Sequence, residues 1–210
     1  SGLMLELVHL YYESHDWMKR GIEVSVFYLD YEGNYQETKD YIERSMGKYP
    51  EFDYYHVCLP VSASCGISMS QSTWLPWDPG HQELWLNSIP PEAICLENQE
   101  FPFFKVGMSD YEFQSKFCQW LHREKEAVRT AVLVGIRAQE SLNRYNAVTR
   151  EETFSRFGTT NYSHRISQDV FNFYPMYDWL FEDIWRANAK FELDYNHLYD
   201  LYYQAGVPYK

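Results

Sequence analysis

An aspartate and two arginines stand where the ends of buried strands could present them to a phosphate-bearing ligand. Asp30 directly follows the apolar run 22–29, and Arg137 directly follows a second such run, with Arg144 further on. A carboxylate at a strand end can hold Mg²⁺ or a sugar hydroxyl, and guanidinium groups form paired hydrogen bonds with phosphate or sulfate oxygens. Gly135 permits close approach of the backbone to a ligand. Together these residues predict an anion site.

These residues also have purely structural alternatives. An aspartate after a strand can cap the following helix or turn through its side-chain oxygens. Glu140 lies between Arg137 and Arg144 in the sequence and can form an ion pair with either of them. The sequence leaves both alternatives open, because they use the same residue types as a ligand site.

Two apolar patterns alternate along the chain and predict the elements that would carry these residues. Runs rich in β-branched and aromatic residues predict buried strands at 22–29, 53–59 and 130–136. Apolar residues at helical spacing predict helices at 3–18, 35–47, 109–127, 178–190 and 194–204. Such alternation is typical of βα units. We therefore predict an α/β fold with a doubly wound, mostly parallel sheet.

The carboxyl ends of parallel strands share one edge of a sheet, and ligands of doubly wound folds bind at that edge. Asp30, Gly135 and Arg137 each stand at the end of a predicted strand. We therefore expect the three residues to converge on one crevice beside the N-terminus of the first helix.

Two segments depart from the regular alternation. Residues 60–108 are rich in Pro, Ser and Trp and predict an irregular insertion, in which Trp74–Trp85 forms a lid or a partner surface because it has few ionisable residues. Residues 149–174 are polar and poorly periodic, as a mobile loop would be. The predicted organisation is a nucleotide-binding α/β core at 1–148, followed at 149–210 by this loop and a C-terminal helical segment packed on the core.

Composition narrows the classes of function. The formal net charge is −12, from 18 Lys and Arg against 30 Asp and Glu, which argues against a nucleic-acid partner. No apolar run reaches the roughly 18 residues of a membrane span, and no signal peptide is recognisable. Four cysteines without CxxC pairing and seven histidines without HExxH spacing give no reason to expect zinc or an iron–sulfur cluster. We expect a cytoplasmic protein with reduced thiols at Cys58, Cys65, Cys95 and Cys118.

Three stretches resemble signatures of one superfamily. Residues 29–38 place an aspartate at a strand end, then an aromatic residue, and then Glu-Thr at the start of the next helix. Residues 133–144 follow a GxRxxES…R pattern, and residues 174–200 follow P-x-x-D-W-x-x-x-D-[VI]-W and then Y-N-x-L-Y. In order and spacing they resemble the phosphoadenosine phosphosulfate (PAPS) reductase-like, PP-loop ATP pyrophosphatase superfamily, whose fold is adenine nucleotide alpha hydrolase-like.

A less characterised bacterial and phage branch of that superfamily shares two further features with this chain. One is the strand end Leu29–Glu32 with Tyr35, and the other is Trp74 with Trp77-Asp78. Some members of this branch are found beside a ParB-like protein. The resemblance therefore implies a ParB-like partner as well as an adenine nucleotide.

The resemblance also implies a phosphate loop, SGGKDS, between a first strand and its helix. Ser1 and Gly2 resemble the tail of this loop, so we expect them to bind phosphate and expect the chain to be a fragment or to lack earlier residues. By the same resemblance, Asp30 is a Mg²⁺ or ribose ligand and a catalytic residue, like Arg137. The other implied phosphate-binding residues are Gly135 and Arg144. The implied cofactors are ATP or PAPS with Mg²⁺.

Three functions follow from the resemblance. The first is an enzyme that binds ATP. A substrate oxygen attacks the α-phosphorus of the ATP, so that the substrate is adenylylated and pyrophosphate is released. The second is reduction of PAPS or adenylylsulfate, or sulfur transfer. PAPS reductases carry a catalytic cysteine in a Glu-Cys-Gly-Leu-His segment, which residues 204–210 do not contain, and none of the four cysteines stands in a matching position. The third is a non-catalytic nucleotide sensor that acts through a protein partner.

Overall fold

The computed structural model of the chain describes residues 2–149, 157 and 162–207. Its contacts divide the chain into two compact units, one made of Ser1–Ile22 with Leu121–Lys210 and the other of Glu23–Trp120. Both units combine helices with parallel strands, so the predicted α/β class is confirmed. The predicted division into a nucleotide-binding core and a helical appendage at residue 148 remains a prediction.

The unit Glu23–Trp120 is built around two parallel strands. β1 (Ser25–Leu29) and β2 (Asp53–Val57) pair residue by residue, from Ser25 opposite Asp53 to Leu29 opposite Val57. α2 (Gln36–Lys48) connects them, as a parallel pair requires a crossover. The two strands and the helix confirm the sequence prediction for this part of the chain.

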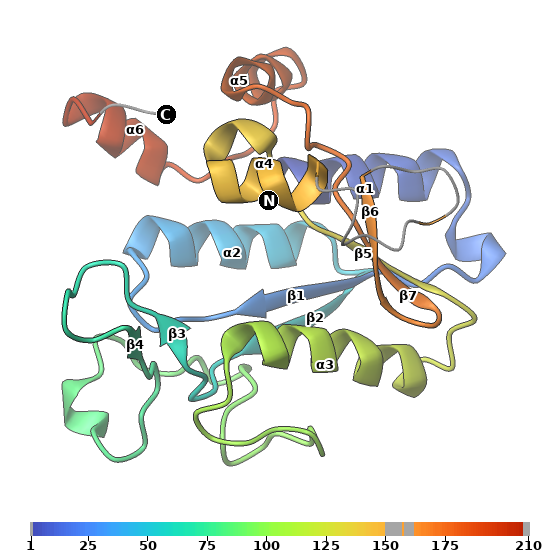
Figure 1. Ribbon diagram of the computed structural model, residues 1–210. Coiled ribbons are helices and arrows are strands. Elements are labelled where there is room, and N and C mark those ends of the chain that lie inside the picture. Colours follow the sequence, from blue (N-terminus) through green and yellow to red (C-terminus); the bar gives the residue numbers. More distant parts are fainter. Residues whose placement is uncertain (1, 150–156, 158–161, 208–210) are drawn as a thin grey trace. The chain divides into compact units, whose positions relative to one another are not determined.

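One helix lies on each face of the β1–β2 pair (Figure 1). α3 (Asp110–Glu124) covers one face. The centroid of its Phe117 ring lies 4.3 Å from the ring centroid of Phe27 in β1 and 5.3 Å from that of Tyr55 in β2. On the other face, the Tyr54 hydroxyl of β2 donates a hydrogen bond to the Ser45 carbonyl of α2. Because side chains alternate along a strand, both faces of the pair are covered, as apolar parallel strands require.

The segment between β2 and α3 is irregular, as predicted. It contains the short antiparallel strands β3 (Ala63–Ser64) and β4 (Thr73–Trp74) and the 3-10 turn η2 (Gln82–Leu84). An isolated parallel bridge pairs Val57 of β2 with Ile94 of this segment, and a second one, Ser62 with Ser109, pairs the two ends of the segment. The insertion is therefore joined by backbone pairing to the end of β2.

The second unit holds a three-stranded ladder. β5 (Thr130–Leu133) pairs parallel with β7 (Val170–Phe173), and β7 pairs antiparallel with β6 (Ser163–Ser167). The prediction of a loop throughout 149–174 is therefore wrong for residues 163–173, which form a β-hairpin. Polar residues of β6 obscure its strand pattern, and pairing with β7 supplies the hydrogen bonds that the periodicity did not reveal. Residues 150–156 and 158–161 lie outside the described part.

Helices make up the rest of this unit. They are α1 (Gly2–Ser14), followed by the 3-10 turn η1 (Met18–Arg20), then the 3-10 turn η3 (Ala138–Glu140), α4 (Leu142–Thr149), α5 (Phe181–Lys190) and α6 (Leu198–Gln204). α1 ends four residues before the predicted limit of 18. Its buried Leu3 and Met4 form a core with Met176, against which Trp179 and Ile184 pack. The predicted helices at both ends of the chain are thus confirmed.

The ladders that the described residues form are separate from one another. β1 pairs with β2, β3 with β4, and β5 with β7 and β6. The parallel neighbours β1 and β2 confirm part of the predicted strand arrangement, whereas β5 has β7 as its parallel neighbour. A single doubly wound sheet remains a prediction.

The aromatic contacts of α3 predict a large effect on stability. Truncation of Phe117, which is 1% exposed, to alanine should lower the free energy of unfolding by about 3–5 kcal/mol, because it removes a buried ring and leaves a cavity. Urea unfolding followed by circular dichroism measures the loss. Tyr111→Ala on the same helix is the matched control, since this side chain is 76% exposed. Equal losses in both variants would contradict the packing described.

Candidate functional site

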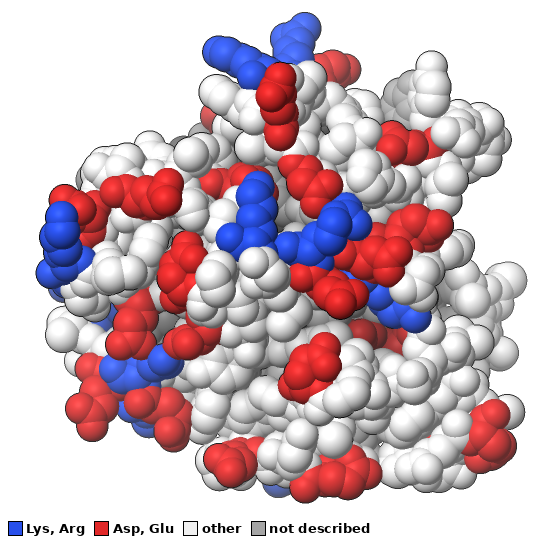
Figure 2. Space-filling view, turned by 180° about the vertical axis from the view of Figure 1, so that it is seen from behind, with Lys and Arg blue, Asp and Glu red and all other residues white. Residues whose placement is uncertain are grey.

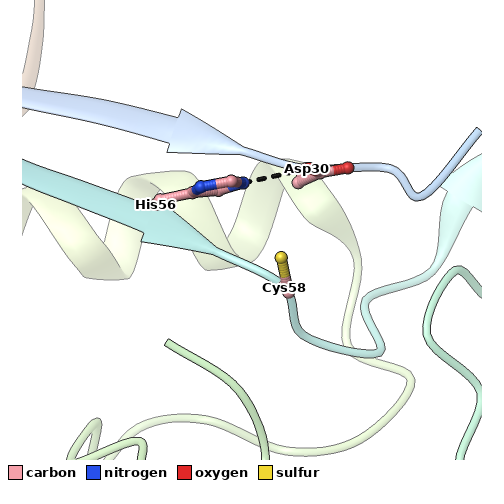
Figure 3. Close-up of side chains that lie close together, drawn as sticks. All are labelled: Asp30, His56 and Cys58. Atoms are coloured by element: carbon pink, nitrogen blue, oxygen red, sulfur yellow. Dashed lines mark hydrogen bonds and ion pairs between the residues drawn. The ribbon is translucent and has the colours of Figure 1, made fainter. Parts of the chain in front are cut away.

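Three side chains with different chemistry meet at the carboxyl ends of β1 and β2. Asp30 follows β1, His56 lies in β2, and Cys58 follows β2 (Figure 3). One ligand atom of each lies within 4.8 Å of the others. The pairing of Leu29 with Val57 accounts for this proximity, because the residues after each strand leave the ladder side by side.

The Asp30 carboxylate is fully engaged with hydrogen-bond donors. Its Oδ1 accepts hydrogen bonds of 2.8 Å from the Glu32 backbone N–H and the Asn34 side-chain amide. Its Oδ2 lies 3.0 Å from His56 Nε2. The residue is 4% exposed, and burial of a carboxylate is tolerable only with such donors. Asp30 therefore holds the turn after β1, which is one of the alternatives that the sequence left open.

Glu32 is a second buried carboxylate at this edge, and it fastens the insertion. Its side-chain oxygens accept hydrogen bonds of 2.9 Å from the backbone N–H groups of Trp77 and Leu86. Its carbonyl oxygen accepts a further bond from the Asn87 side chain. Glu32 has a positive φ of 67°, so the chain turns sharply where these bonds form. The sequence analysis placed this residue in a motif but did not identify its role.

The burial of Trp77 shows that the predicted lid is wrong for this residue. Its indole Nε1–H donates a 2.7 Å hydrogen bond to the Asp30 carbonyl, and its ring packs with Cys58 and Ala93 and edge-on against Trp85. The residue is 2% exposed, so it is a packing residue rather than part of a lid or partner surface. A buried indole is favourable here because its single polar group has a partner. Trp74, in β4, is only partly buried.

Burial also changes the acid–base chemistry of this edge. It raises the pKa of the Cys58 thiol, and the negative charge of Asp30 adds to the effect. Burial and Asp30 likewise raise the pKa of Tyr28, whose ring centroid lies 5.0 Å from that of His56. On α3, burial raises the pKa of Cys118 to about 11. The Cys58 and Cys118 thiols are therefore protonated at neutral pH and are weak nucleophiles.

A second group of predicted site residues lies in the other unit, after β5. Arg137 Nε donates to Glu140 Oε1 at 3.0 Å, and Arg144 forms an ion pair with the same carboxylate. Both of the pairings that the sequence left open are therefore present. Gln139 accepts a 2.7 Å hydrogen bond from the Phe181 N–H, which places the beginning of α5 beside this segment. Gly135 lies between β5 and Arg137.

The predicted residues thus fall into two groups. Asp30 belongs to the unit Glu23–Trp120, whereas Gly135, Arg137 and Arg144 belong to the unit that contains β5. Gly2 begins α1, and Ser1 lies outside the described residues. Convergence of Asp30 with Gly135 and Arg137 on one crevice remains a prediction. The sequence analysis missed His56 and Cys58, since neither belongs to a short motif.

Acidic and basic side chains are mixed on the face of the molecule that Figure 2 shows. The 30 acidic residues outnumber the 18 basic ones, and on the face shown in Figure 2 the basic side chains stand among acidic ones without forming a continuous basic surface. In the part of the chain that the structure describes, no helix has the length and apolar character needed to cross a membrane.

Comparison with known proteins identifies a family and a relative of this chain. The model of the family described as phosphoadenosine phosphosulfate reductase domain matches residues 93–205, which confirms the resemblance noted in the sequence. The uncharacterized protein YbdN of Escherichia coli (strain K12) is 33% identical over 214 aligned residues, which cover 99% of this chain and 49% of that protein. The chain thus spans about half the length of this curated relative. No solved structure matches.

The hydrogen bonds of Asp30 predict its effect on folding. Asp30→Ala should lower the free energy of unfolding by about 3 kcal/mol, because it leaves the buried donors of Glu32, Asn34 and His56 without their acceptor. Urea unfolding measures this. Asp40→Ala is the control, since Asp40 is exposed on α2 and should change stability by less than about 0.5 kcal/mol. An unchanged unfolding midpoint for Asp30→Ala would contradict the structural role.

Proposed function

The chain belongs to the phosphoadenosine phosphosulfate reductase domain family, and from this premise we propose that it binds ATP or a related adenine nucleotide and promotes cleavage at the α-phosphate. In this reaction a substrate oxygen attacks the α-phosphorus, the bond from that phosphorus to the bridging oxygen breaks, and pyrophosphate leaves. The product is an adenylylated substrate. The curated relative is about twice as long as this chain, so the substrate and partners of the whole protein are part of the proposal.

The observation that carries the proposal is the pair of guanidinium groups after β5. Arg137 and Arg144 share the Glu140 carboxylate, and all three residues lie within the part matched by the family model. β5 and its neighbour β7 are parallel, so both end at the same edge of their ladder. Ligands of open α/β sheets bind at that edge. A phosphate there would meet both guanidinium groups.

Neighbouring backbone groups support an anion at this place. The beginning of α5 lies beside Gln139, and the N-terminus of a helix carries a partial positive charge. Acidic Glu182 and Asp183 stand in its first turn, but the Asp183 carboxylate is occupied by the Leu180 N–H. Glu140 balances the arginines when no ligand is bound. An incoming phosphate would compete with Glu140 for their N–H groups.

Each predicted site residue has a role in the proposal. Arg137 and Arg144 hold phosphate oxygens and stabilise the charge that develops during attack. Gly135 lets the backbone approach the ligand. Ser1 and Gly2 bind phosphate at the beginning of α1, where backbone N–H groups have no partner within the helix. Asp30 is the ligand for Mg²⁺ or for a ribose hydroxyl.

A second candidate is reduction of PAPS or adenylylsulfate, or sulfur transfer, and the family description favours it. Reduction needs a thiolate that attacks sulfur, and burial raises the pKa of both Cys58 and Cys118. We therefore rank it second. A non-catalytic nucleotide sensor that acts through a ParB-like protein is the third candidate.

Product analysis separates the candidates. The protein is incubated with Mg²⁺-ATP and, separately, with PAPS and a dithiol reductant. Release of pyrophosphate from ATP supports adenylyl transfer, and release of sulfite from PAPS supports reduction. Nucleotide binding with neither product supports the sensor.

The role of Arg137 gives a direct prediction. Arg137→Ala should weaken ATP binding by about 1.5–3 kcal/mol, the usual value of a charge-assisted hydrogen bond. This corresponds to a Kd roughly 10- to 160-fold higher, as measured by titration calorimetry. Folding should be preserved, because Glu140 keeps its ion pair with Arg144. Arg123→Ala, exposed at the end of α3, is the matched control. An unchanged affinity in Arg137→Ala would remove the anion-binding role.

The thiols give a prediction that distinguishes the first two candidates. A variant in which Cys58, Cys65, Cys95 and Cys118 are all changed to serine should bind ATP with unchanged affinity. Some stability should be lost, since Cys58 and Cys118 are in apolar surroundings. Calorimetry and thermal unfolding measure the two effects. Loss of turnover in a single cysteine variant that is still folded would favour reduction or sulfur transfer instead.

A further inference from the structure

The three side chains at the end of β1 and β2 form a donor set of which the proposed function uses only Asp30. Asp30 offers a carboxylate oxygen, His56 an imidazole nitrogen and Cys58 a sulfur, all within 4.8 Å of one another. Figure 3 shows the Cys58 sulfur pointing from the loop after β2 toward the other two side chains. We propose that Asp30, His56 and Cys58 bind a zinc-class transition-metal ion.

The chemistry of the donors selects the kind of metal. Mg²⁺ and Ca²⁺ prefer oxygen ligands, whereas a sulfur, a nitrogen and one carboxylate suit Zn²⁺. Typical bond lengths of about 2.0–2.3 Å to a tetrahedral zinc ion place its ligand atoms about 3.3–3.6 Å apart. Donor atoms at the 4.8 Å limit therefore need to close by about 1.2–1.5 Å, whereas the Asp30–His56 pair, at 3.0 Å, needs to open slightly. This assignment replaces the role of Asp30 as a Mg²⁺ ligand in the proposed function, and Mg²⁺ that accompanies a nucleotide would then be held by phosphates and water.

The surroundings of Asp30 already orient it as a metal ligand. Its Oδ1 is held by two donors, the Glu32 N–H and the Asn34 amide, so its Oδ2 is the oxygen directed at His56. Partners of this kind fix the geometry of metal ligands and raise metal affinity. On metal binding, the hydrogen bond between Oδ2 and His56 would be replaced by two bonds to the ion, and the Nε2 proton would move through solvent to Nδ1. The Cys58 thiol releases its proton to solvent and binds as thiolate.

Apolar side chains cover Cys58 and limit the access of water to the proposed site. Cys58 packs with Trp77 and Ala93, and Trp85 and Ile89 pack against these residues. Such a shell excludes water and strengthens each metal–ligand bond. The segment with Cys95 runs beside this one, since the Cys58 N–H donates a 2.8 Å hydrogen bond to the Ile94 carbonyl. The Cys95 sulfur is not among the donor atoms that lie within 4.8 Å of one another, so Asp30, His56 and Cys58 supply three ligands of the proposed ion.

Spectroscopy with cobalt tests the proposal on the whole chain. Protein prepared in chelator should bind one equivalent of Co²⁺ with visible bands of tetrahedral cobalt and a thiolate-to-cobalt charge-transfer band. An equivalent of Zn²⁺ should abolish these bands, and excess Mg²⁺ should not. Zn²⁺ should also raise the midpoint of thermal unfolding. Absence of the charge-transfer band, or displacement by Mg²⁺, would overturn the proposal.

Variants identify the ligands. Cys58→Ala should weaken Co²⁺ binding by about 100-fold or more, because loss of even a supporting residue costs 10- to 100-fold. Cys118→Ser, which changes a thiol on α3 away from the cluster, should leave it unchanged. If Cys58→Ala does not fold, X-ray absorption of the zinc-loaded natural chain decides, since a sulfur neighbour supports the site and a shell of only nitrogen and oxygen refutes it. An unchanged cobalt spectrum in folded Cys58→Ala also refutes it.

Discussion

The parallel, in-register pairing of β1 with β2 is the constraint on which the first unit depends. It brings the chain beyond Leu29 and the chain beyond Val57 out of the ladder together. Asp30, His56 and Cys58 meet for that reason alone, although 26 residues separate the first two. A carboxylate that becomes buried at such a place must find donors, because leaving a charge unpaired in a protein interior costs several kcal/mol. The turn through Glu32 and Asn34 supplies them.

The same requirement explains how the insertion is attached. Glu32 is buried as well, and its acceptors are satisfied by backbone N–H groups from the insertion rather than by basic side chains. Trp77 closes the arrangement by donating to the Asp30 carbonyl. Two acidic residues and one indole thus fasten an irregular segment to a regular ladder. A segment with few regular hydrogen bonds of its own becomes part of the core in this way.

Electrostatics in the second unit follow a different logic. Arg137 and Arg144 are local partners of Glu140. The two ion pairs join residues three and four positions apart in the segment that follows β5. A chain with a net charge of −12 does not attract phosphate over long distances, so any affinity for an anion must come from short, directed hydrogen bonds. Guanidinium groups are suited to such bonds, and Glu140 is the partner of both in the structure.

The sequence by itself determined most of the helices and strands and the family, and it offered an ion pair of Glu140 with Arg137 or Arg144 as one alternative. These features depend on periodicity, on motifs and on residues within one helical turn of each other. Only the tertiary structure decided the β6–β7 hairpin, the burial of Trp77 and the meeting of His56 and Cys58 with Asp30. The polar pattern of β6 says nothing of its partner, and an aromatic residue fits a lid as well as a core. Strand register joins residues that no spacing rule connects, because it is set by hydrogen bonds between segments far apart in the chain.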